Sequence, residues 1–346
     1  MNFRLIAKFA LAAAIGLVSA ASPSVADDKI IKLDGSSTVY PVSEAIAEEF
    51  QKANKGTKVT VGVSGTGGGF KKFCRGEIDI ADASRPILAE EMKLAKENGI
   101  EYIELPICFD ALTVVVNKDN TWAETMTTAD LKKIWEPGAQ SKITKWNQVR
   151  PEWPDAKITL YGPGSDSGTF DYFTEAVCGK SKASRGDYTA SEDDNILVCG
   201  VEGDKNALGY FGYAYYAEHK AKLKAVKIDW DKDTVGAIEP SPENVIKGIY
   251  NPLSRPLFIY VNKKTAQTRP EVAKFVAFYL ENAASMATEV KYVALPQNAY
   301  GMVSERWKKM DTGTVFGGKP EVGLTIDELL SRETVETIKE QMPDKK

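Results

Sequence analysis

The sequence stretch KVTVGVSGTGGGF (residues 58–70) carries the pattern on which the fold depends. Its first six residues are rich in valine and threonine, which is typical of a β-strand. The cluster of glycine, serine and threonine at residues 64–69 is typical of a turn, and a short helix is expected after it. The stretch therefore predicts a strand that enters a helix through a glycine-rich turn.

The same order of elements recurs on both sides of this stretch. An apolar run at residues 30–33 precedes a helical pattern at residues 41–50. Residues 78–82 alternate like a strand, residues 89–97 have helical spacing, and residues 103–105 return to a strand. Strands and helices that alternate at such short intervals predict an α/β fold with mainly parallel sheets flanked by helices.

Two distant segments resemble each other and indicate two lobes. Residues 111–118 and 256–263 are both strongly β-forming, and both end in Val-Asn-Lys. We interpret them as strands that cross between the lobes, which predicts lobe I from residues 27–112 plus 257–346 and lobe II from residues 113–256. The alternative is that both are ordinary buried strands.

The N-terminus has the features of a signal peptide at residues 1–26. Arg4 and Lys8 precede an apolar run of about ten residues, which is shorter than the roughly 20 residues of a membrane span. Ser24 and Ala26 are the small residues expected before a cleavage site. We therefore expect a periplasmic, soluble mature protein, with a retained membrane anchor as the alternative.

The composition excludes one class of partner. The chain has 346 residues and a net charge of −4, which becomes −6 without Arg4 and Lys8. An acidic chain lacks the basic surface that nucleic acids require, so no nucleic-acid partner is expected. Removal of 26 residues leaves 346 − 26 = 320, enough for two domains with separate cores.

Four cysteines remain in the exported chain. An even number in an oxidising compartment predicts two disulfides, for which three pairings exist. We favour Cys74–Cys108 and Cys178–Cys199, because each pair closes a loop of moderate length. The spacing does not match a CxxC metal site and the chain has a single histidine, so no metal or other cofactor is expected.

Three turns share a design that suits an anion. They are Gly35-Ser36-Ser37-Thr38, Ser64-Gly65-Thr66-Gly67-Gly68-Gly69 and Gly164-Ser165-Asp166-Ser167-Gly168-Thr169, and each joins a strand to a helix. A helix N-terminus offers unpaired N–H groups, serine and threonine add hydroxyl donors, and glycine allows a close approach. Any one of these turns is equally explained as a helix cap. Three of them at the carboxyl ends of strands predict an anion site.

A fourth segment adds charge to this site. Asp82-Ala83-Ser84-Arg85-Pro86 follows a predicted strand, so Ser84 and Arg85 are expected to enter the same cleft. A guanidinium is always positive and its donors suit a tetrahedral oxyanion. The alternative is a surface arginine in an ordinary salt bridge.

Together these segments resemble the periplasmic phosphate-binding proteins of Pst-type ABC importers. The resemblance covers most of the mature chain and is strongest at residues 64–69, residues 76–86 and Ser167-Gly168-Thr169. It implies a two-lobed periplasmic-binding-protein fold of type II, a monomer that closes on inorganic phosphate and docks on the membrane permease subunits of an ABC transporter. It also implies that hydroxyl and backbone groups donate to phosphate, and the candidate residues are Ser37, Thr38, Thr66, Gly67, Ser84, Arg85, Asp166, Ser167, Gly168 and Thr169.

The chain departs from the family at two positions. Better-known members have an aspartate that accepts the phosphate proton where this chain has Ser84, and an arginine where it has Pro163. We expect Arg85 to supply the missing positive charge. Asp34, Asp82 and Asp166 are the candidate proton acceptors, with Asp166 favoured, and Asp82 is expected to share a strand face with Ser84.

Two other functions are compatible with parts of the sequence. The donor-rich turns would also suit sulfate or a phosphonate. The string Asp166-Ser167-Gly168 resembles the surroundings of a serine nucleophile, but the only histidine is His219 in a charged helix end. The glycine cluster does not match a P-loop, because Lys71 follows Phe70 and not a glycine. We therefore expect a binding protein and not an enzyme.

Overall fold

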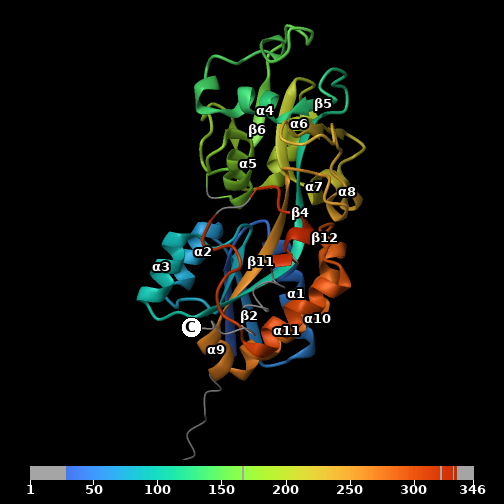
Figure 1. Cartoon of the computed structure of the whole chain (residues 1–346). Helices are drawn as coiled ribbons and strands as arrows, with labels where there is room; N and C mark the ends of the chain where they lie inside the picture. Colours follow the sequence, from blue (N-terminus) through green and yellow to red (C-terminus); the bar gives the residue numbers. More distant parts are fainter. Residues whose placement is uncertain (1–28, 166, 320–321, 330, 333–346) are drawn as a thin grey trace, which may run out of the picture.

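The computed structural model describes residues 29–165, 167–319, 322–329 and 331–332. The predicted signal peptide and Asp166 lie outside the described residues. Figure 1 shows two lobes, one above the other, connected by the long strands β4 (Tyr102–Asn117) and β11 (Ser254–Asn262). Within the described part of the chain, no helix is long and apolar enough to cross a membrane.

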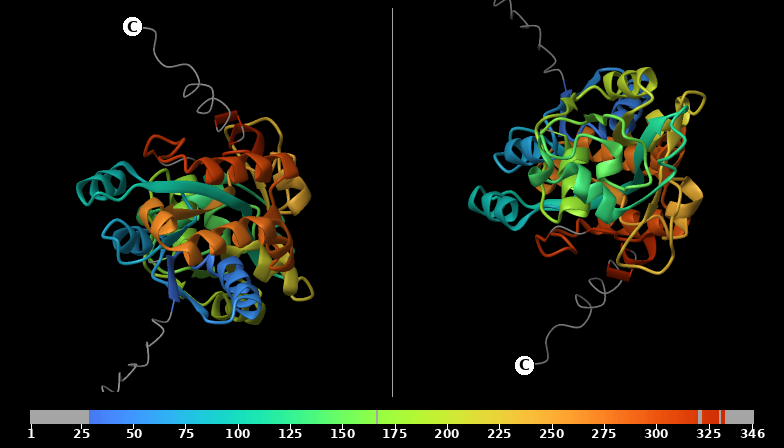
Figure 2. Two further views of the ribbon diagram at one scale, coloured as in Figure 1. Left: turned by 90° about the horizontal axis from the view of Figure 1, so that it is seen from below. Right: turned by 90° about the horizontal axis from the view of Figure 1, so that it is seen from above.

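The lower lobe contains both ends of the described chain. Its remaining elements are β1 (Lys29–Gly35), α1 (Tyr40–Ala53), β2 (Thr57–Val63), α2 (Thr66–Phe73), β3 (Ile80–Ala83), α3 (Ala89–Glu97), α9 (Lys263–Thr268), α10 (Pro270–Glu289), β12 (Val293–Ala294) and α11 (Gln297–Lys309). The view from below shows the blue helix α1 beside the orange α10, so the early and late parts of the chain form one lobe (Figure 2).

The upper lobe is built from the middle of the chain. It contains β5 (Thr125–Thr127), α4 (Thr128–Trp135), β6 (Thr159–Gly162), α5 (Gly168–Cys178), β7 (Thr189–Ala190), α6 (Asp194–Gly203), β8 (Ala207–Gly212), α7 (Tyr213–Glu218), β9 (Leu223–Ala225), β10 (Lys227–Asp229) and α8 (Pro242–Ile246). Residues 207–212 form a fully buried strand, and α7 begins directly after it at Tyr213.

A single twisted sheet runs through both lobes in the order β2-β1-β3-β11-β4-β8-β6-β7. The pairs β1–β2, β1–β3, β6–β7 and β6–β8 are parallel, whereas β4 and β11 pair antiparallel with their neighbours. The sheet is therefore mixed, with parallel strands in each lobe and antiparallel strands at the junction. All 16 residues of β4 and all 9 of β11 are buried, as expected for strands covered on both faces.

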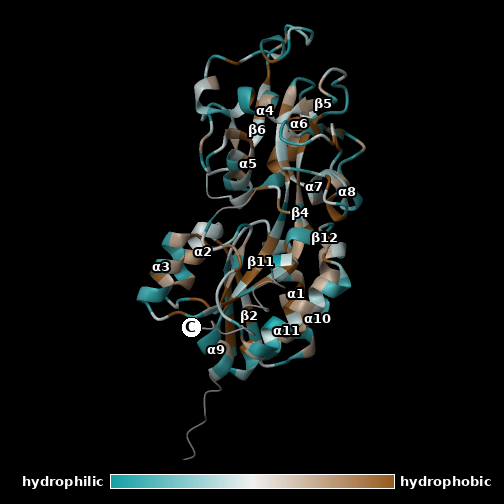
Figure 3. Cartoon of the chain, viewed as in Figure 1, coloured by the Kyte–Doolittle hydropathy of each residue, from teal (hydrophilic) through white to brown (hydrophobic). Residues whose placement is uncertain are grey.

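Helices cover both faces of the sheet in each lobe. In the lower lobe α2 and α3 lie on one side and α1, α10 and α11 on the other, while α4 and α5 oppose α6 and α7 in the upper lobe (Figure 1). Hydrophobic residues are frequent along β4 and β11 (Figure 3), and most of the buried residues of the chain are apolar. This burial provides most of the driving force for the fold.

The prediction of two disulfides is wrong, because all four cysteines are free thiols. In the lower lobe, the Cys74 thiol donates to the Glu91 backbone oxygen at 3.4 Å, on the side covered by α3. Cys108 instead lies close to Tyr279 of α10, so the sheet separates the two sulfur atoms.

The second predicted pair fails for the same reason. Cys178 ends α5 and lies near Lys132 of α4, whereas Cys199 is exposed on α6 near Lys222. These helices cover opposite faces of the upper sheet. A bridge requires Cα atoms within about 7 Å, which a sheet between the two residues prevents.

Candidate functional site in the crevice between the lobes

The turns of the lower lobe meet at one edge of the sheet. β1 pairs parallel with both β2 and β3, so the carboxyl ends of all three strands point toward the upper lobe. Thr38 lies after β1 and before α1, Thr66 opens α2, and Ser84 follows β3 directly. The fold therefore carries three hydroxyl groups to the crevice, as the strand–turn–helix pattern predicts.

Thr66 and Ser84 form the first contact within the site. Their hydroxyl oxygens are 3.0 Å apart, and the Ser84 backbone N–H donates to the Thr66 hydroxyl at 3.2 Å. Gly168 of the upper lobe lies against both side chains. A Cβ at Gly168 would be 2.0 Å from the Ser84 Oγ and 2.9 Å from the Thr66 Oγ1, so only glycine fits between the lobes at this point.

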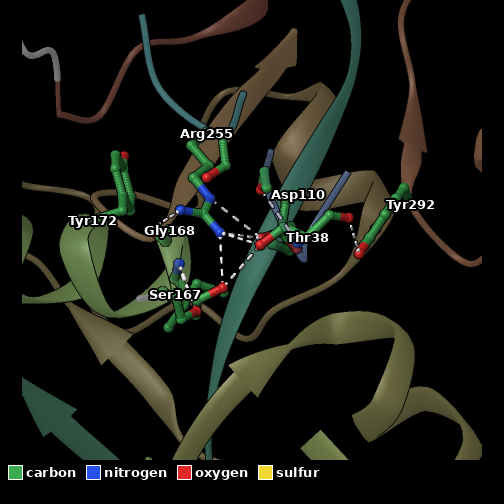
Figure 4. A network of polar contacts seen from close by, with 12 residues as sticks. Thr38, Asp110, Ser167, Gly168, Tyr172, Arg255 and Tyr292 are labelled. Atoms are coloured by element: carbon green, nitrogen blue, oxygen red, sulfur yellow. Dashed lines mark hydrogen bonds and ion pairs between the residues drawn. The ribbon is translucent and has the colours of Figure 1, made fainter. Parts of the chain in front are cut away.

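Thr38 and Thr169 join the lobes a second time. Their Oγ1 atoms are 3.0 Å apart, although the residues are 131 positions apart in the sequence. Ser167 caps α5, because its hydroxyl accepts from the Thr169 N–H at 3.1 Å. The Tyr292 hydroxyl donates to the Thr38 backbone oxygen at 2.7 Å and fixes that turn (Figure 4).

Arg255 lies at the centre of these hydroxyls, on the crossing strand β11 (Figure 4). Its Nη2 donates to the Thr38 Oγ1 at 3.0 Å and the Thr169 Oγ1 at 2.9 Å, and its Nη1 donates to the Gly168 backbone oxygen at 2.6 Å. The side chain is only 1 % exposed. A permanent positive charge thus lies buried where the two lobes meet.

Asp110 balances this charge from the other crossing strand, β4. Its Oδ2 accepts from the Arg255 Nε at 3.3 Å and Nη2 at 3.1 Å. Its Oδ1 is buried and has no hydrogen-bond partner among the described residues. Burial raises the pKa of this carboxyl, while the neighbouring guanidinium acts in the opposite direction. The second oxygen is therefore an acceptor available to a group that carries a proton.

Arg85 lies at the edge of the crevice, where another acid holds it. Its Nη1 and Nη2 donate to the two oxygens of Glu91 at 2.9 and 2.8 Å, and its guanidinium lies over the Phe70 ring at 5.4 Å. A Cβ at Gly67 would lie 3.7 Å from Arg85, which places this glycine beside it. Both arginines are paired with an acid, but the hydrogen bonds of Arg85 go to Glu91 and the Pro86 oxygen. Arg255 instead donates to two of the site hydroxyls.

The proposed proton acceptors of the lower lobe contact residues other than Arg255. Asp34 forms a salt bridge with Lys72 at 2.5 Å and accepts from the Ser64 hydroxyl. The Asp82 Oδ1 accepts from Ser43 of α1 at 2.9 Å, while its Oδ2 is buried without a hydrogen-bond partner among the described residues. The expectation that Asp82 shares a strand face with Ser84 does not hold, because β3 ends at Ala83 and the strand alternation stops there. Burial raises the pKa of Asp82 to about 7.

Three other candidates have different outcomes. Ser37 is half-buried in the turn before α1, whereas Asp166 is outside the described residues. The His219 Nδ1 lies 2.7 Å from Glu202 of α6, so His219 pairs with an acid of the upper lobe and not with a serine of the crevice. Among the described residues no group of three or more metal-ligating side chains is present.

Sequence reasoning missed Arg255 and Asp110. Asp110 and Arg255 directly precede the two segments, residues 111–118 and 256–263, that the sequence pattern assigned to the crossing strands. The available signal was a charge next to each apolar run, because a charged residue is almost never fully buried unless it is paired. Two such charges of opposite sign on the two crossing strands predict a buried pair.

Comparison with known proteins places this architecture in a family. A model of the PBP superfamily domain matches residues 18–283. The chain belongs to the PBP superfamily. Its relatives include the protein SphX of Synechocystis, which is 54% identical over 91% of this chain and 93% of the relative. The phosphate-binding protein PstS of Staphylococcus saprophyticus is 41% identical over 81% of this chain and 84% of the relative.

Solved structures of the PBP superfamily agree with this assignment. A possible phosphate-binding protein from Planctomyces limnophilus is 52% identical, with a TM-score of 0.66 over 81% of this chain and 98% of that chain. A putative phosphate ABC transporter substrate-binding protein from Clostridium perfringens, solved with bound phosphate, is 25% identical. Its TM-score is 0.63, and the match covers 77% of this chain and 100% of that chain. The two-lobed architecture is therefore that of periplasmic phosphate-binding proteins.

Proposed function

We propose that this protein captures inorganic phosphate in the crevice between its lobes and delivers it to an ABC-type importer. The observation that carries the proposal is the ring of hydroxyls from both lobes around buried Arg255. The relatives named as phosphate-binding proteins and the neighbour solved with bound phosphate support the choice of ligand. Binding without chemical conversion fits the described part of the site, in which a cation and hydroxyls are present and no serine is hydrogen-bonded to a histidine or a lysine.

The proposed site assigns a role to each group. Hydroxyls of Thr38, Thr66, Ser84 and Thr169 donate to the phosphate oxygens, because a dehydrated anion is stable only when nearly every oxygen has a donor. Arg255 supplies the positive charge, in place of the role that the sequence assigned to Arg85. The predicted residues Ser37, Gly67, Asp166, Ser167 and Gly168 complete the turns of the site.

We further propose that Asp110 accepts the proton that phosphate carries at neutral pH. Its Oδ1 is buried without a partner among the residues that the structure describes, and its Oδ2 is bound to Arg255. Sulfate has no such proton, so a carboxylate at this point would repel sulfate while it accepts a hydrogen bond from phosphate. Asp110 would thereby replace the aspartate that the family has at the position of Ser84.

Capture requires the lobes to move relative to each other. We propose a hinge at the boundaries predicted from the sequence, with residues 27–112 and 257–346 in one lobe and residues 113–256 in the other. Phosphate that bridges donors of both lobes would bind the closed state more tightly and shift the population toward it. The closed monomer then docks on permease subunits at the periplasmic side of the membrane.

Native mass spectrometry and calorimetry test this function. We expect the purified protein to carry one phosphate, and the stripped protein to bind phosphate in preference to sulfate and methylphosphonate. Tight binding of sulfate or a phosphonate, with weak binding of phosphate, would identify a different oxyanion as the ligand. A stripped protein that is indifferent to all three would refute the proposal.

A further inference from the structure

The C-terminal segment makes a third connection between the lobes. At residues 316–318 the chain lies on the lower lobe, where Phe316 packs edge-on against Phe258 with centroids 5.6 Å apart and the Gly318 oxygen accepts from the Ala89 N–H at 2.9 Å. By Gly323 it has reached the upper lobe, because the Gly323 N–H donates to the Tyr172 hydroxyl at 3.2 Å. Figure 1 shows this orange-red segment rising to the level at which the lobes meet.

We call residues 322–329 the C-terminal strap. The strap is anchored by apolar side chains, because Leu324, Ile326 and Leu329 are each at most 3% exposed. Thr325 and Glu328 form reciprocal hydrogen bonds, in which the Thr325 N–H donates to Glu328 at 2.9 Å and the Glu328 N–H donates to Thr325 at 3.2 Å. These bonds begin a helical turn. The strap is thus a built element and not a loose tail.

Tyr172 of α5 connects the strap to the crossing strand. Its hydroxyl lies 2.8 Å from the backbone oxygens of both Pro252 and Ser254, which share its single proton, and it accepts from the Gly323 N–H. These carbonyls flank the start of β11, immediately before Arg255. The Arg255 guanidinium lies over the Tyr172 ring, 5.2 Å from its centroid, and such a contact favours a cation over the ring face.

The strap also forms one wall of a space beside Arg255. A small cavity is lined by Leu324 together with Tyr172, Arg255, Ser84, Arg85 and Pro256. Leu324 therefore limits the access of solvent to the guanidinium from the side of the strap. Exclusion of water strengthens the electrostatic interactions of a buried charge.

We propose that Tyr172, held by the C-terminal strap, is the positioning residue of Arg255, so that the strap sets phosphate affinity without contacting phosphate. The proposal rests on the proposed function, because Arg255 is the charge assigned to the ligand. Long arginine side chains have many rotamers, and fixing one of them in advance lowers the entropy lost on binding. The Tyr172 ring lies under the Arg255 guanidinium, and the Tyr172 hydroxyl binds the backbone just before Arg255.

The test compares two matched tyrosines. Tyr172→Phe removes a hydroxyl that donates to backbone carbonyls and accepts a backbone N–H. Tyr300→Phe is the control, because the Tyr300 hydroxyl is also buried, donates to the Ile107 oxygen at 2.8 Å and accepts from the Leu295 N–H at 3.3 Å, in the lower lobe away from Arg255. Phosphate titration by calorimetry is measured with the melting temperature of each variant.

We expect Tyr172→Phe to weaken phosphate binding about 10-fold, consistent with the loss of hydrogen bonds that position a charged group, and Tyr300→Phe to change it less than 2-fold. Leu324→Ala is expected to weaken binding as Tyr172→Phe does. If the two tyrosine variants lose melting temperature alike and bind phosphate alike, the hydroxyl is structural and the inference is wrong.

Hydrogen exchange distinguishes failure of this inference from failure of the proposed function. In the ligand-free protein, Tyr172→Phe should speed amide exchange in peptides that cover residues 250–257 and 322–329, and Tyr300→Phe should not. If wild type does not bind phosphate, the proposed function fails while this measurement still decides whether the strap holds the start of β11. Unchanged exchange in both peptides would overturn the inference.

Discussion

Substitution of Asp110 by asparagine should reverse part of the preference for phosphate over sulfate. The carboxylate is fully buried, with Oδ2 bound to Arg255 at 3.1 Å and Oδ1 unpaired among the described residues. Asparagine has nearly the same shape and keeps one oxygen for Arg255, so the packing is retained, although the buried guanidinium loses its counter-charge and stability should fall. It loses the negative charge, and its amide group donates where the carboxylate oxygen accepted.

The magnitude follows from the bond that phosphate loses. A hydrogen bond to a charged group is worth about 1.5–3 kcal/mol, which corresponds to a roughly 10- to 150-fold weaker phosphate affinity. Sulfate loses a repulsion at the same time, because it has no proton to share with a carboxylate. The ratio of sulfate to phosphate dissociation constants should therefore fall by more than the loss in phosphate affinity alone.

Isothermal titration with both anions at pH 7.5 measures this ratio directly. Asp82→Asn is the matched control, because Asp82 is also a fully buried carboxylate but is bound to Ser43 and not to Arg255. If Asp110→Asn binds with the wild-type ratio, Asp110 does not receive the proton. A loss of selectivity of equal size in Asp82→Asn would show that the effect comes from buried charge in general.

Three further predictions concern charge, fit and pH. Arg255→Lys should weaken phosphate binding at least about 10-fold more than Arg85→Ala does, because lysine lacks the planar fork that serves several acceptors. If calorimetry shows the larger loss in Arg85→Ala, the cation of the site is Arg85. Gly168→Ala should weaken binding about 5- to 150-fold through an overpacking cost of about 1–3 kcal/mol, whereas Gly203→Ala, with open space around its Cβ, should bind as wild type. Equal affinities of the two variants would mean that the lobes do not close here. Burial raises the pKa of Asp82 from 3.8 to about 7, so between about pH 4 and 7 the folded state holds a proton that the unfolded state releases. The free energy of unfolding should therefore fall by roughly 1.4 kcal/mol per pH unit in that range. Denaturant unfolding of Asp82→Asn should lack this slope, and an identical slope in both proteins would contradict the assignment.

The position of the crevice could be predicted from the sequence because it depends on strand direction. Parallel strands end at one edge, so the hydroxyl turns at Thr38 and Thr66 had to lie together there once β1 and β2 were recognised. The meeting with Thr169 of the other lobe required the resemblance as well, since no local pattern specifies how two lobes face each other.

The charges of the site and the state of the cysteines could not be predicted in the same way. Arg255 and Asp110 are separated by 145 positions and pair only because their strands are neighbours in the sheet. The spacing of Cys74 and Cys108 gives the length of a loop but not the sheet face on which each thiol lies. Which residues pair in this way depends on the order of the strands in the sheet and on the face that each side chain occupies. Both are properties of the tertiary structure, which local sequence patterns do not encode.

The buried ion pair is located on the two strands that cross between the lobes, and this has a kinetic consequence. A point close to a pivot is displaced little when two rigid bodies rotate about it, so Arg255 should keep its place in open and closed forms alike. An incoming anion then meets the same attractive potential whatever the angle between the lobes. The association rate of the anion would then depend on Arg255, and its dissociation rate on the hydroxyls that each lobe brings to the crevice.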